Sequence, residues 1–335
     1  MRMTKKLISI LVILVCVCLV LSACGKDDNS SIPKVESNNV NTSETPSDTS
    51  SKEETSKPTS QPESSAPVSN SMVTSTVKPQ LINVTVGSYE IYDALNSRGL
   101  STKKSGYGYG VAQNGKPHSI SVNNQKYFES LQNTEALALD TKSTDKVMYL
   151  TFDCGYEYKN LTANILDTLK EKQVKAAFFL TGDYVKKNAT LVRRMIDEGH
   201  ILGNHSWGHK SFPTISREKM ANEIWQLEDY LKKNFDYSSP YFRFPSGEYS
   251  ECALELVSSM GYKSIFWSAA YADWDTSNQP TKESAVNTVT SRYHGGAVIL
   301  LHAVSQANAD GLAEMIDIAH NQGYTFKTLD DYYNS

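Results

Sequence analysis

The sequence predicts an α/β fold, a closed or nearly closed (β/α) barrel of about seven units over residues 146–335. Short apolar segments rich in β-branched and aromatic residues recur along this region, as expected for strands that are buried on both faces. Helix-like segments separate them, and repeated β-then-α units indicate a parallel sheet with right-handed crossovers. An open doubly wound sheet is the structural alternative.

The N-terminus has the layout of a bacterial lipoprotein signal. Basic residues within 2–6 precede an apolar run over 7–21, and small residues stand just before Cys24. We therefore expect residues 1–24 to be a signal peptide and Cys24 to carry a lipid that anchors the protein in the membrane. A plain secretory signal or an uncleaved anchor is the alternative. In each case the remaining chain lies outside the cytoplasm, and we expect it on the extracytoplasmic face of the cell membrane.

A polar segment follows the signal. Residues 25–79 consist mainly of Ser, Thr, Asn, Pro, Glu and Lys, with few aliphatic residues. This composition cannot bury enough apolar surface to offset the entropy of ordering the chain, so we expect a disordered linker. Residues 80–145 include the segment "SGYGYGVAQNGKPHS" and are expected to form an N-terminal extension that packs on the barrel.

The predicted elements of the barrel follow one another in a regular order. The expected strands are "VMYLTF" at 147, "KAAFFLT" at 175, "HILGN" at 200, "YFRF" at 241, "KSIFWS" at 263, "AVILLH" at 297 and "YTFKT" at 324. Apolar residues spaced on one helical face predict helices over 161–169 and 217–231, the second with "SREK" as its N-terminal cap. A third helix is expected over about 308–322.

Composition limits the classes of function. The formal net charge of the chain is −4, so no basic surface predicts nucleic-acid binding. Only Cys154 and Cys252 lie beyond the signal region, and two cysteines are too few for a disulfide scaffold. A Cys154–Cys252 disulfide is conceivable outside the cell, but sequence alone does not place the two sulfurs within bonding reach. We expect a monomer that is stabilised by its packed core.

Side chains that can carry out chemistry gather where the predicted strands end. Active sites of parallel α/β folds form at the carboxyl ends of the strands, so we expect these side chains to face one opening. Each alone has an ordinary structural explanation, such as a helix cap or a surface ion pair, but their joint position at strand ends favours a site. They are Asp153, Cys154, His205, His209, Arg243, Asp273, Trp274 and His302.

His205 and His209 are the candidate metal ligands. They are four residues apart, so both imidazoles can point the same way from one turn. A pair of neutral imidazoles is a common start to a site for zinc or another divalent metal. A surface pair is the alternative for this spacing, and the position after a strand and opposite Asp153 favours the metal site. The other histidines are expected to be structural; they are His118, His200, His294 and His320.

Five short motifs occur in the order "TFDCGYE", "HSWGH", "RFPSG", "ADW" and "LLH". In order and spacing they resemble the motifs of the polysaccharide deacetylases, the NodB-homology family or carbohydrate esterase family 4, over roughly residues 145–333. Flanking segments such as "EGHILGNHSWGH" and "ILLHAVSQANA" resemble one branch of this family, the sporulation muramic-acid deacetylases or delta-lactam-biosynthetic de-N-acetylases.

The resemblance implies a metal-assisted amide hydrolase on a distorted (β/α) barrel. Asp153 resembles the general base, and Arg243 resembles the residue that orients it. His302 resembles the general acid, and Asp273 resembles its carboxylate partner. The resemblance further implies that a divalent metal, expected to be Zn²⁺, is held by His205 and His209, and that substrate is bound by Tyr156, Trp207, Pro245 and Trp274.

The sequence departs from the family pattern at the first and fourth motifs. Cys154 stands where most members have a second aspartate that binds the metal. A thiolate can ligate zinc, so Cys154 is a tentative third ligand, and a small buried side chain is the alternative. Ala270 stands where many chitooligosaccharide-type members carry a further acid, which favours the muramic-acid branch. Ser246, in contrast, stands where a basic residue would suit the lactyl carboxylate of muramic acid.

The function expected from the sequence is de-N-acetylation of peptidoglycan strands, with N-acetylmuramic acid as the substrate and muramic delta-lactam in spore cortex as the later product. The alternative within the enzyme class is an N-acetylglucosamine or chitooligosaccharide deacetylase. The alternative from another class is a wall-binding lipoprotein whose catalysis is impaired by Cys154. The intact acids and histidines of the five motifs favour an enzyme.

Overall fold

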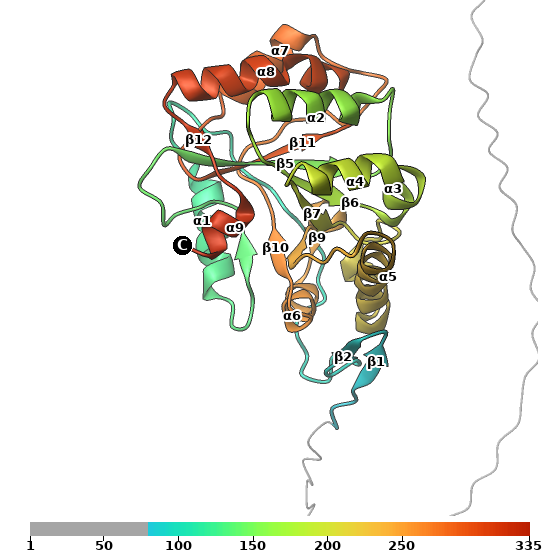
Figure 1. The fold of residues 1–335 in the computed structure, drawn as a ribbon. Helices are drawn as coiled ribbons and strands as arrows, with labels where there is room; N and C mark the ends of the chain where they lie inside the picture. Colours follow the sequence, from blue (N-terminus) through green and yellow to red (C-terminus); the bar gives the residue numbers. More distant parts are fainter. Residues whose placement is uncertain (1–79) are drawn as a thin grey trace, which may run out of the picture. The chain divides into compact units, whose positions relative to one another are not determined.

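A computed structural model describes residues 80–335, and Figure 1 shows their fold. The expected signal peptide, Cys24 and the expected linker lie outside these residues. Within residues 80–335, no helix has the length and apolar character needed to span a bilayer.

The strands are β1 (Val84–Val86), β2 (Tyr89–Ile91), β3 (Ser105–Gly106), β4 (Ala136–Leu137), β5 (Val147–Cys154), β6 (Ala177–Leu180), β7 (Ile201–Asn204), β8 (Tyr241–Phe242), β9 (Glu248–Tyr249), β10 (Lys263–Ile265), β11 (Ala297–His302) and β12 (Thr325–Phe326). The helices are α1 (Ser119–Ser130), α2 (Leu161–Glu171), α3 (Gly182–Lys187), α4 (Ala189–Asp197), α5 (Arg217–Phe235), α6 (Glu251–Ser259), α7 (Lys282–Thr290), α8 (Gln306–Asn321) and α9 (Leu329–Tyr333).

The main sheet has eight strands, and every pair in it is parallel. The strand order is β11-β5-β6-β7-β8-β10-β4, and β12 pairs with the start of β5. The sheet curls, and Leu139, just after β4, forms a bridge with Ala297 of β11, so the two edges approach each other. This arrangement confirms the expected distorted barrel rather than an open doubly wound sheet. Helices cover its outer face, with α2, α7 and α8 beside β5 and β11 (Figure 1).

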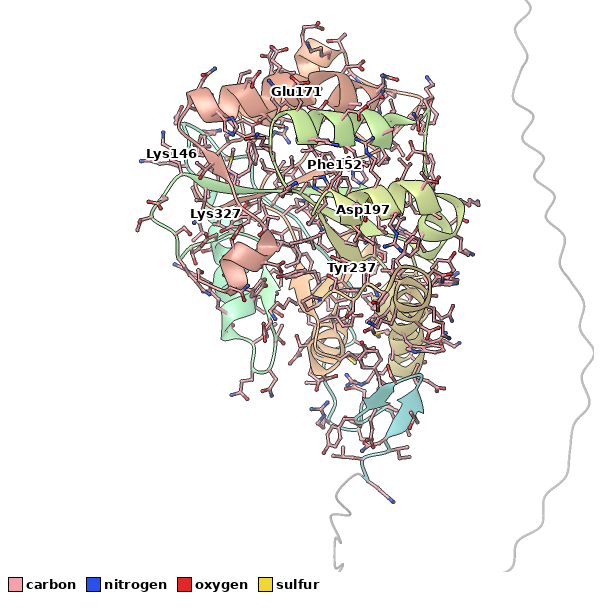
Figure 2. All side chains as sticks on the ribbon, in the orientation of Figure 1. Lys146, Phe152, Glu171, Asp197, Tyr237 and Lys327 are labelled. Carbon is pink, nitrogen blue, oxygen red and sulfur yellow. The ribbon has the colours of Figure 1, made fainter. Side chains whose placement is uncertain are left out.

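Strand β5 separates two hydrophobic cores. All its residues are buried, because successive side chains point to opposite faces of the sheet and both faces are covered. Met148 and Phe152 pack outward against the residues of α2 and α8. Tyr149 packs inward with residues of the neighbouring strands and of α9. Figure 2 shows Phe152 in the interior, whereas Lys146 and Glu171 lie at the periphery.

The helices bury the faces that their apolar spacing predicts. In α2 the buried residues include Leu161, Ile165, Leu166 and Leu169. Helix α5 follows Ser216, whose Oγ accepts the backbone N–H of Lys219, as the predicted N-terminal cap requires. Helix α8 begins after Ser305, which caps it in the same way, and spans nearly the predicted range. These three predictions are confirmed.

The N-terminal extension contributes a strand to the sheet. Strand β4 pairs with β10, with Ala136 opposite Ser264. The expected boundary at residue 146 therefore divides the sheet, and the barrel includes the last part of the extension. A two-residue strand is too short for hydrophobic alternation to reveal it in the sequence.

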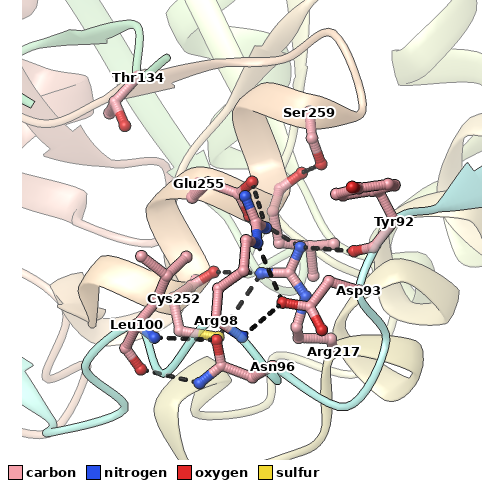
Figure 3. Close-up of polar contacts among 12 residues, drawn as sticks. Tyr92, Asp93, Asn96, Arg98, Leu100, Thr134, Arg217, Cys252, Glu255 and Ser259 are labelled. Atoms are coloured by element: carbon pink, nitrogen blue, oxygen red, sulfur yellow. Dashed lines mark hydrogen bonds and ion pairs between the residues drawn. The ribbon is translucent and has the colours of Figure 1, made fainter. Parts of the chain in front are cut away.

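Ion pairs fix the beginning of the extension to α5 and α6 (Figure 3). Arg98 pairs with Asp93 at 3.0 Å and with Glu255 of α6 at 2.7 Å. Arg217 of α5 is buried, pairs with Glu255 at 2.7 Å and donates to the backbone carbonyl of Tyr92 at 3.1 Å. The extension is therefore attached to the outer helices by charge-assisted contacts as well as by apolar packing.

Candidate active site

The carboxyl ends of the sheet strands surround a cavity of about 1020 Å³. Because the strands are parallel, residues that end them or follow them lie on the same side of the sheet. The structure thus brings together the polar residues that the sequence places at strand ends. Those lining the cavity are Asp153, His205, His209, Trp274 and His302, while Arg243 and Asp273 lie fully buried behind them.

Arg243, directly after β8, holds the Asp153 carboxylate. Its Nη1 donates to Asp153 Oδ1 at 2.8 Å, and the residue has no solvent exposure. Its other donors are also used, since Nε donates to the Ile265 carbonyl at 2.9 Å and Nη2 to the Phe266 carbonyl at 3.3 Å. The guanidinium carbon lies 4.1 Å from the ring centroid of Phe179. The carboxylate is therefore oriented by a side chain that is itself fixed.

Asp153 is ionised at neutral pH. Burial would raise the pKa of Asp153, but the charge and the hydrogen bond of Arg243, with the nearby His302, offset burial, and the pKa of the carboxyl lies below its ordinary value. An ionised carboxylate that lines a cavity can accept a proton from a bound water.

A tight turn after β7 points two imidazoles into the cavity. Asn204 Oδ1 accepts the backbone N–H of Ser206 at 2.9 Å, and Ser206 Oγ accepts the backbone N–H of His209 at 2.9 Å. Ser206 and His209 both have left-handed backbone angles, with φ of 66° and 52°. The ring centroids of His205 and His209 are 4.8 Å apart.

His205 presents a free nitrogen to the cavity. Its Nδ1 lies 2.8 Å from the backbone carbonyl of Arg243, which only accepts, so Nδ1 carries the proton. Nε2 then bears a lone pair, 3.5 Å from Asp153 Oδ2. Burial lowers the pKa of His205 to about 4 and also lowers the pKa of His209, so both rings are neutral at pH 7.

These residues fit a divalent metal. Two neutral imidazoles on one turn, the first with its Nδ1 proton bound by a carbonyl, are the donors that zinc sites use. Within residues 80–335, no three His, Cys, Asp or Glu side chains are arranged together as a complete metal site. His205 and His209 therefore supply two imidazole donors for a cation but do not by themselves make a complete site.

The structure does not bring Cys154 to this cavity. Its side chain has no exposure and packs in the outer core with Leu180 and Tyr184, not among the residues that line the cavity. Successive residues of a strand point to opposite faces, so the side chain after Asp153 turns toward the helices. Burial, together with the charge of Asp153, raises the pKa of the Cys154 thiol, which favours the form that does not bind metal. The tentative assignment of Cys154 as a ligand is corrected accordingly, and neither Cys154 nor Cys252 is in a disulfide.

His302 faces the cavity from the end of β11 and is held by Asp273. Its Nδ1 lies 2.7 Å from Asp273 Oδ1, and its backbone N–H donates to Asp273 Oδ2 at 2.8 Å. Asn308 of α8 also donates to Asp273 Oδ2, at 2.5 Å. Burial would lower the pKa of His302, but the hydrogen bond and charge of Asp273 more than offset burial and raise the pKa. The sequence did not indicate Asn308, because a helix-start asparagine is ordinarily read as a cap.

Aromatic side chains form the rim of the cavity. Tyr156 is 47% exposed and Trp274 57% exposed, and both line the cavity together with Trp207. Pro245 does not line it; it is buried in the short turn after β8, so its expected contact with substrate is corrected. None of the four histidines expected to be structural lines this cavity.

Several residues of the cavity wall were not predicted from the sequence, among them Tyr109, Thr181, Asp183 and Tyr271. Tyr109, in the N-terminal extension, lines the cavity together with Trp267, Ala270 and Leu300. The available signal was the alternation of glycine and tyrosine in "GYGYG", which has no recognised role in the five motifs. Ser246 and Ala270, the two positions that bear on substrate choice, also line the cavity.

Comparison with known proteins agrees with this geometry. A family model described as polysaccharide deacetylase matches residues 140–265. The peptidoglycan-N-acetylmuramic acid deacetylase PdaA of Bacillus subtilis is 41% identical over 188 residues, which cover 56% of this chain and 71% of that protein. The chain belongs to the polysaccharide deacetylase family. Members of this family are hydrolases, and its deacetylases are in general metal-dependent.

Further comparisons place this polysaccharide deacetylase within carbohydrate esterase family 4. The solved structure of Bacillus subtilis PdaA, described as a family 4 carbohydrate esterase, has a TM-score of 0.64 and 34% identity, and the match covers 70% of this chain and 100% of that one. A peptidoglycan-N-acetylglucosamine deacetylase of Bacillus cereus is 31% identical over 190 residues, 56% of this chain and 68% of that protein. The resemblance inferred from the five motifs is confirmed.

Proposed function

We propose that the protein removes the acetyl group from N-acetylmuramic acid residues of peptidoglycan. The observation that carries the reaction is that an ionised carboxylate, Asp153, and an imidazole with a raised pKa, His302, face the same cavity. A proton acceptor and a proton donor on two sides of a bound substrate are what amide hydrolysis needs. The choice of sugar is supported by the 41% identity to a muramic acid deacetylase and by Ala270 in place of an acid.

In this mechanism the two proton-transfer residues have separate roles. Asp153 accepts the proton of the attacking water, and Arg243 keeps the carboxylate ionised and oriented. His302 donates a proton to the departing sugar amine, and Asp273 keeps that imidazole protonated and positioned. The products are acetate and a free amine on the sugar. We further propose that this amine can condense with the lactyl carboxyl group, with loss of water, to give muramic delta-lactam in spore cortex.

A divalent metal, in our proposal Zn²⁺, would be held by His205 and His209. When bound there, such an ion polarises the acetamide carbonyl and lowers the pKa of a coordinated water. The two rings are already neutral, so binding a cation does not require them to lose a proton. Tyr156, Trp207 and Trp274 would hold the sugar rings at the rim.

We also propose that the enzyme acts on the wall from the outer face of the cell membrane, tethered through a lipid on Cys24. The basic, apolar and small-residue layout before Cys24 supports this proposal. Replacement of Cys24 by Ala should move the protein from the membrane fraction to the soluble or secreted fraction, as followed by immunoblotting. An unchanged membrane fraction would instead support an uncleaved N-terminal anchor.

The test of the reaction is acetate release by the mature protein with zinc. The substrates are glycan strands freed of stem peptides by an amidase and, in parallel, N-acetylglucosamine oligomers. We expect deacetylated muramic acid by mass spectrometry of the digested glycan, and no release by Asp153→Asn. Deacetylated glucosamine without deacetylated muramic acid would indicate that N-acetylglucosamine is the substrate. Binding of glycan without acetate release under any divalent metal would favour a wall-binding protein with impaired catalysis.

A further inference from the structure

We propose that Tyr109, from the N-terminal extension, is a specificity-determining residue whose ring binds the glycan strand in the cavity. Among the described residues before β5, Tyr109 is the one that lines this cavity. It lies outside the matched family region, residues 140–265, and outside the five motifs. The inference deepens the proposed function and rests on it for the identity of the ligand.

The segment Ser105–Gly110 is fastened across the carboxyl ends of the barrel strands. Strand β3 at its start pairs antiparallel with β9, which follows the turn after β8. The next backbone N–H, that of Tyr107, donates to the Gly247 carbonyl at 2.8 Å. Asn124 of α1 donates to the Gly108 carbonyl at 2.6 Å. The backbone of the segment is therefore held by β9 and Gly247 on one side and by the Asn124 side chain on the other.

The two tyrosines of the segment have different surroundings. Tyr107 packs on Phe266 and Trp267, with ring centroids 4.6 Å and 5.1 Å away, and its hydroxyl donates to the Trp267 carbonyl at 2.7 Å. Tyr107 thus anchors the segment in a further hydrophobic cluster that includes Phe128, Phe244 and Phe266. Tyr109, two residues further along the chain, lines the cavity instead.

The Tyr109 ring is fixed although it lines open space. Its hydroxyl donates to the Ala270 carbonyl, and Arg292 Nη1 donates to the Tyr109 oxygen at 3.3 Å and to the same carbonyl. Gly110 allows this path, because a Cβ at that position would lie 1.9 Å from the His118 ring. A ring that is already ordered loses little conformational freedom when a ligand binds, which favours a binding role.

The neighbouring cavity wall is built for recognition rather than for proton transfer. The Tyr109 hydroxyl donates to the Ala270 carbonyl, and Ala270, Trp267 and Leu300 are lining residues that do not titrate. Apolar and aromatic walls with a few fixed polar groups are typical of ligand-binding sites. A sugar ring has an apolar face that suits such a wall, so the ligand expected there is a sugar of the strand, either the reacting one or its neighbour.

The test uses the mature protein with Asp153→Asn, which separates binding from reaction. The probe is amidase-treated glycan oligosaccharide, and its Kd is measured by calorimetry. We expect Tyr109→Ala to weaken binding about tenfold and Tyr109→Phe to stay within about twofold. Tyr127→Ala is the matched control, since Tyr127 is an exposed tyrosine of the same extension that does not line the cavity. In the active enzyme, Tyr109→Ala should raise KM about tenfold and leave kcat within about twofold.

Three results would overturn the inference. The first is that Tyr109→Ala binds the oligosaccharide as tightly as the parent, and the second is that kcat falls while KM is unchanged. The third is that Tyr109→Ala and Tyr127→Ala lose the same affinity for the oligosaccharide. If Tyr109→Ala does not fold, Tyr109→Leu replaces it. The inference would then be overturned if the Tyr109→Leu protein bound the oligosaccharide as tightly as the Tyr109→Phe protein. Failure of the proposed function has a different outcome. In that case the protein with Asp153 intact releases no acetate, while oligosaccharide binding still depends on the Tyr109 ring.

Discussion

Arg243 donates a 2.8 Å hydrogen bond to Asp153 from a position with no solvent exposure. The same residue accepts, through its backbone carbonyl, the hydrogen bond that sets the tautomer of His205. Arg243, directly after β8, therefore positions both the proposed proton acceptor, Asp153, and one proposed metal ligand, His205.

Arg243→Lys should remove much of the activity although it keeps the charge. An ammonium group cannot reproduce the planar set of donors that reaches Asp153 and two backbone carbonyls, so the carboxylate loses its orientation. We expect kcat for acetate release to fall about 100-fold. The control is Arg193→Lys, at an exposed arginine, which should be neutral. Activity of Arg243→Lys near that of the parent would contradict the positioning role.

Asp273→Asn should shift the pH dependence of the reaction. Asp273 raises the pKa of His302, so the protonated imidazole persists to higher pH and is lost as pH rises through the raised value. Without the carboxylate this pKa falls, and the alkaline limb of the kcat profile should move to lower pH, with kcat at neutral pH reduced about 10- to 100-fold. Asp310→Asn, at an exposed aspartate of α8, is the control. An unmoved alkaline limb would show that His302 is not the group that titrates.

His205→Ala and Cys154→Ala should differ in their effect on metal binding. The first removes a nitrogen that faces the cavity and should weaken zinc binding at least about tenfold. The second removes a sulfur from the outer core and should leave zinc affinity unchanged, at a cost of about 1 kcal/mol in the free energy of unfolding. Zinc titration after dialysis against a chelator measures the first effect, and urea unfolding the second. Equal losses of zinc affinity would return Cys154 to the ligand set.

Arg217→Ala should destabilise the attachment of the extension. The side chain is buried, and its loss leaves the Tyr92 carbonyl without this donor and removes one of the two arginines that pair with Glu255. We expect the free energy of unfolding to fall by about 2–4 kcal/mol. Lys233→Ala, which breaks the exposed pair with Asp229, should cost at most about 0.5 kcal/mol. Similar midpoints of the two variants in urea would argue against a structural role for the buried pair.

The sequence predicted the barrel because its main strands are apolar on both faces and its helices keep a clear apolar stripe. The sequence did not predict β4, because a strand of two residues is too short to show an alternation of apolar and polar side chains. The polar residues at strand ends were found because a parallel sheet places all such ends on one side. The same reasoning failed for Cys154, since the end of a strand was predicted but the side to which each residue points was not.

Two residues of the site that lie outside the five motifs were also not predicted. Tyr109 reaches the cavity only because the extension crosses the barrel rim, and no local pattern encodes that path. Asn308 contacts Asp273 through the packing of α8 against β11, which depends on tertiary structure. The position of a residue at the end of a predicted strand reveals only the groups that the sheet carries. Tyr109 and Asn308 lie in segments that pack over the sheet, so this criterion does not find them.

The shared dependence of Asp153 and His205 on Arg243 has a mechanical consequence. Asp153 is bound by the Arg243 side chain and His205 by the Arg243 backbone carbonyl, so a change in the rim that leaves Arg243 in place should leave these two groups together. We therefore expect substitutions at the rim to change which glycan binds, while the distance between Asp153 and His205 stays the same.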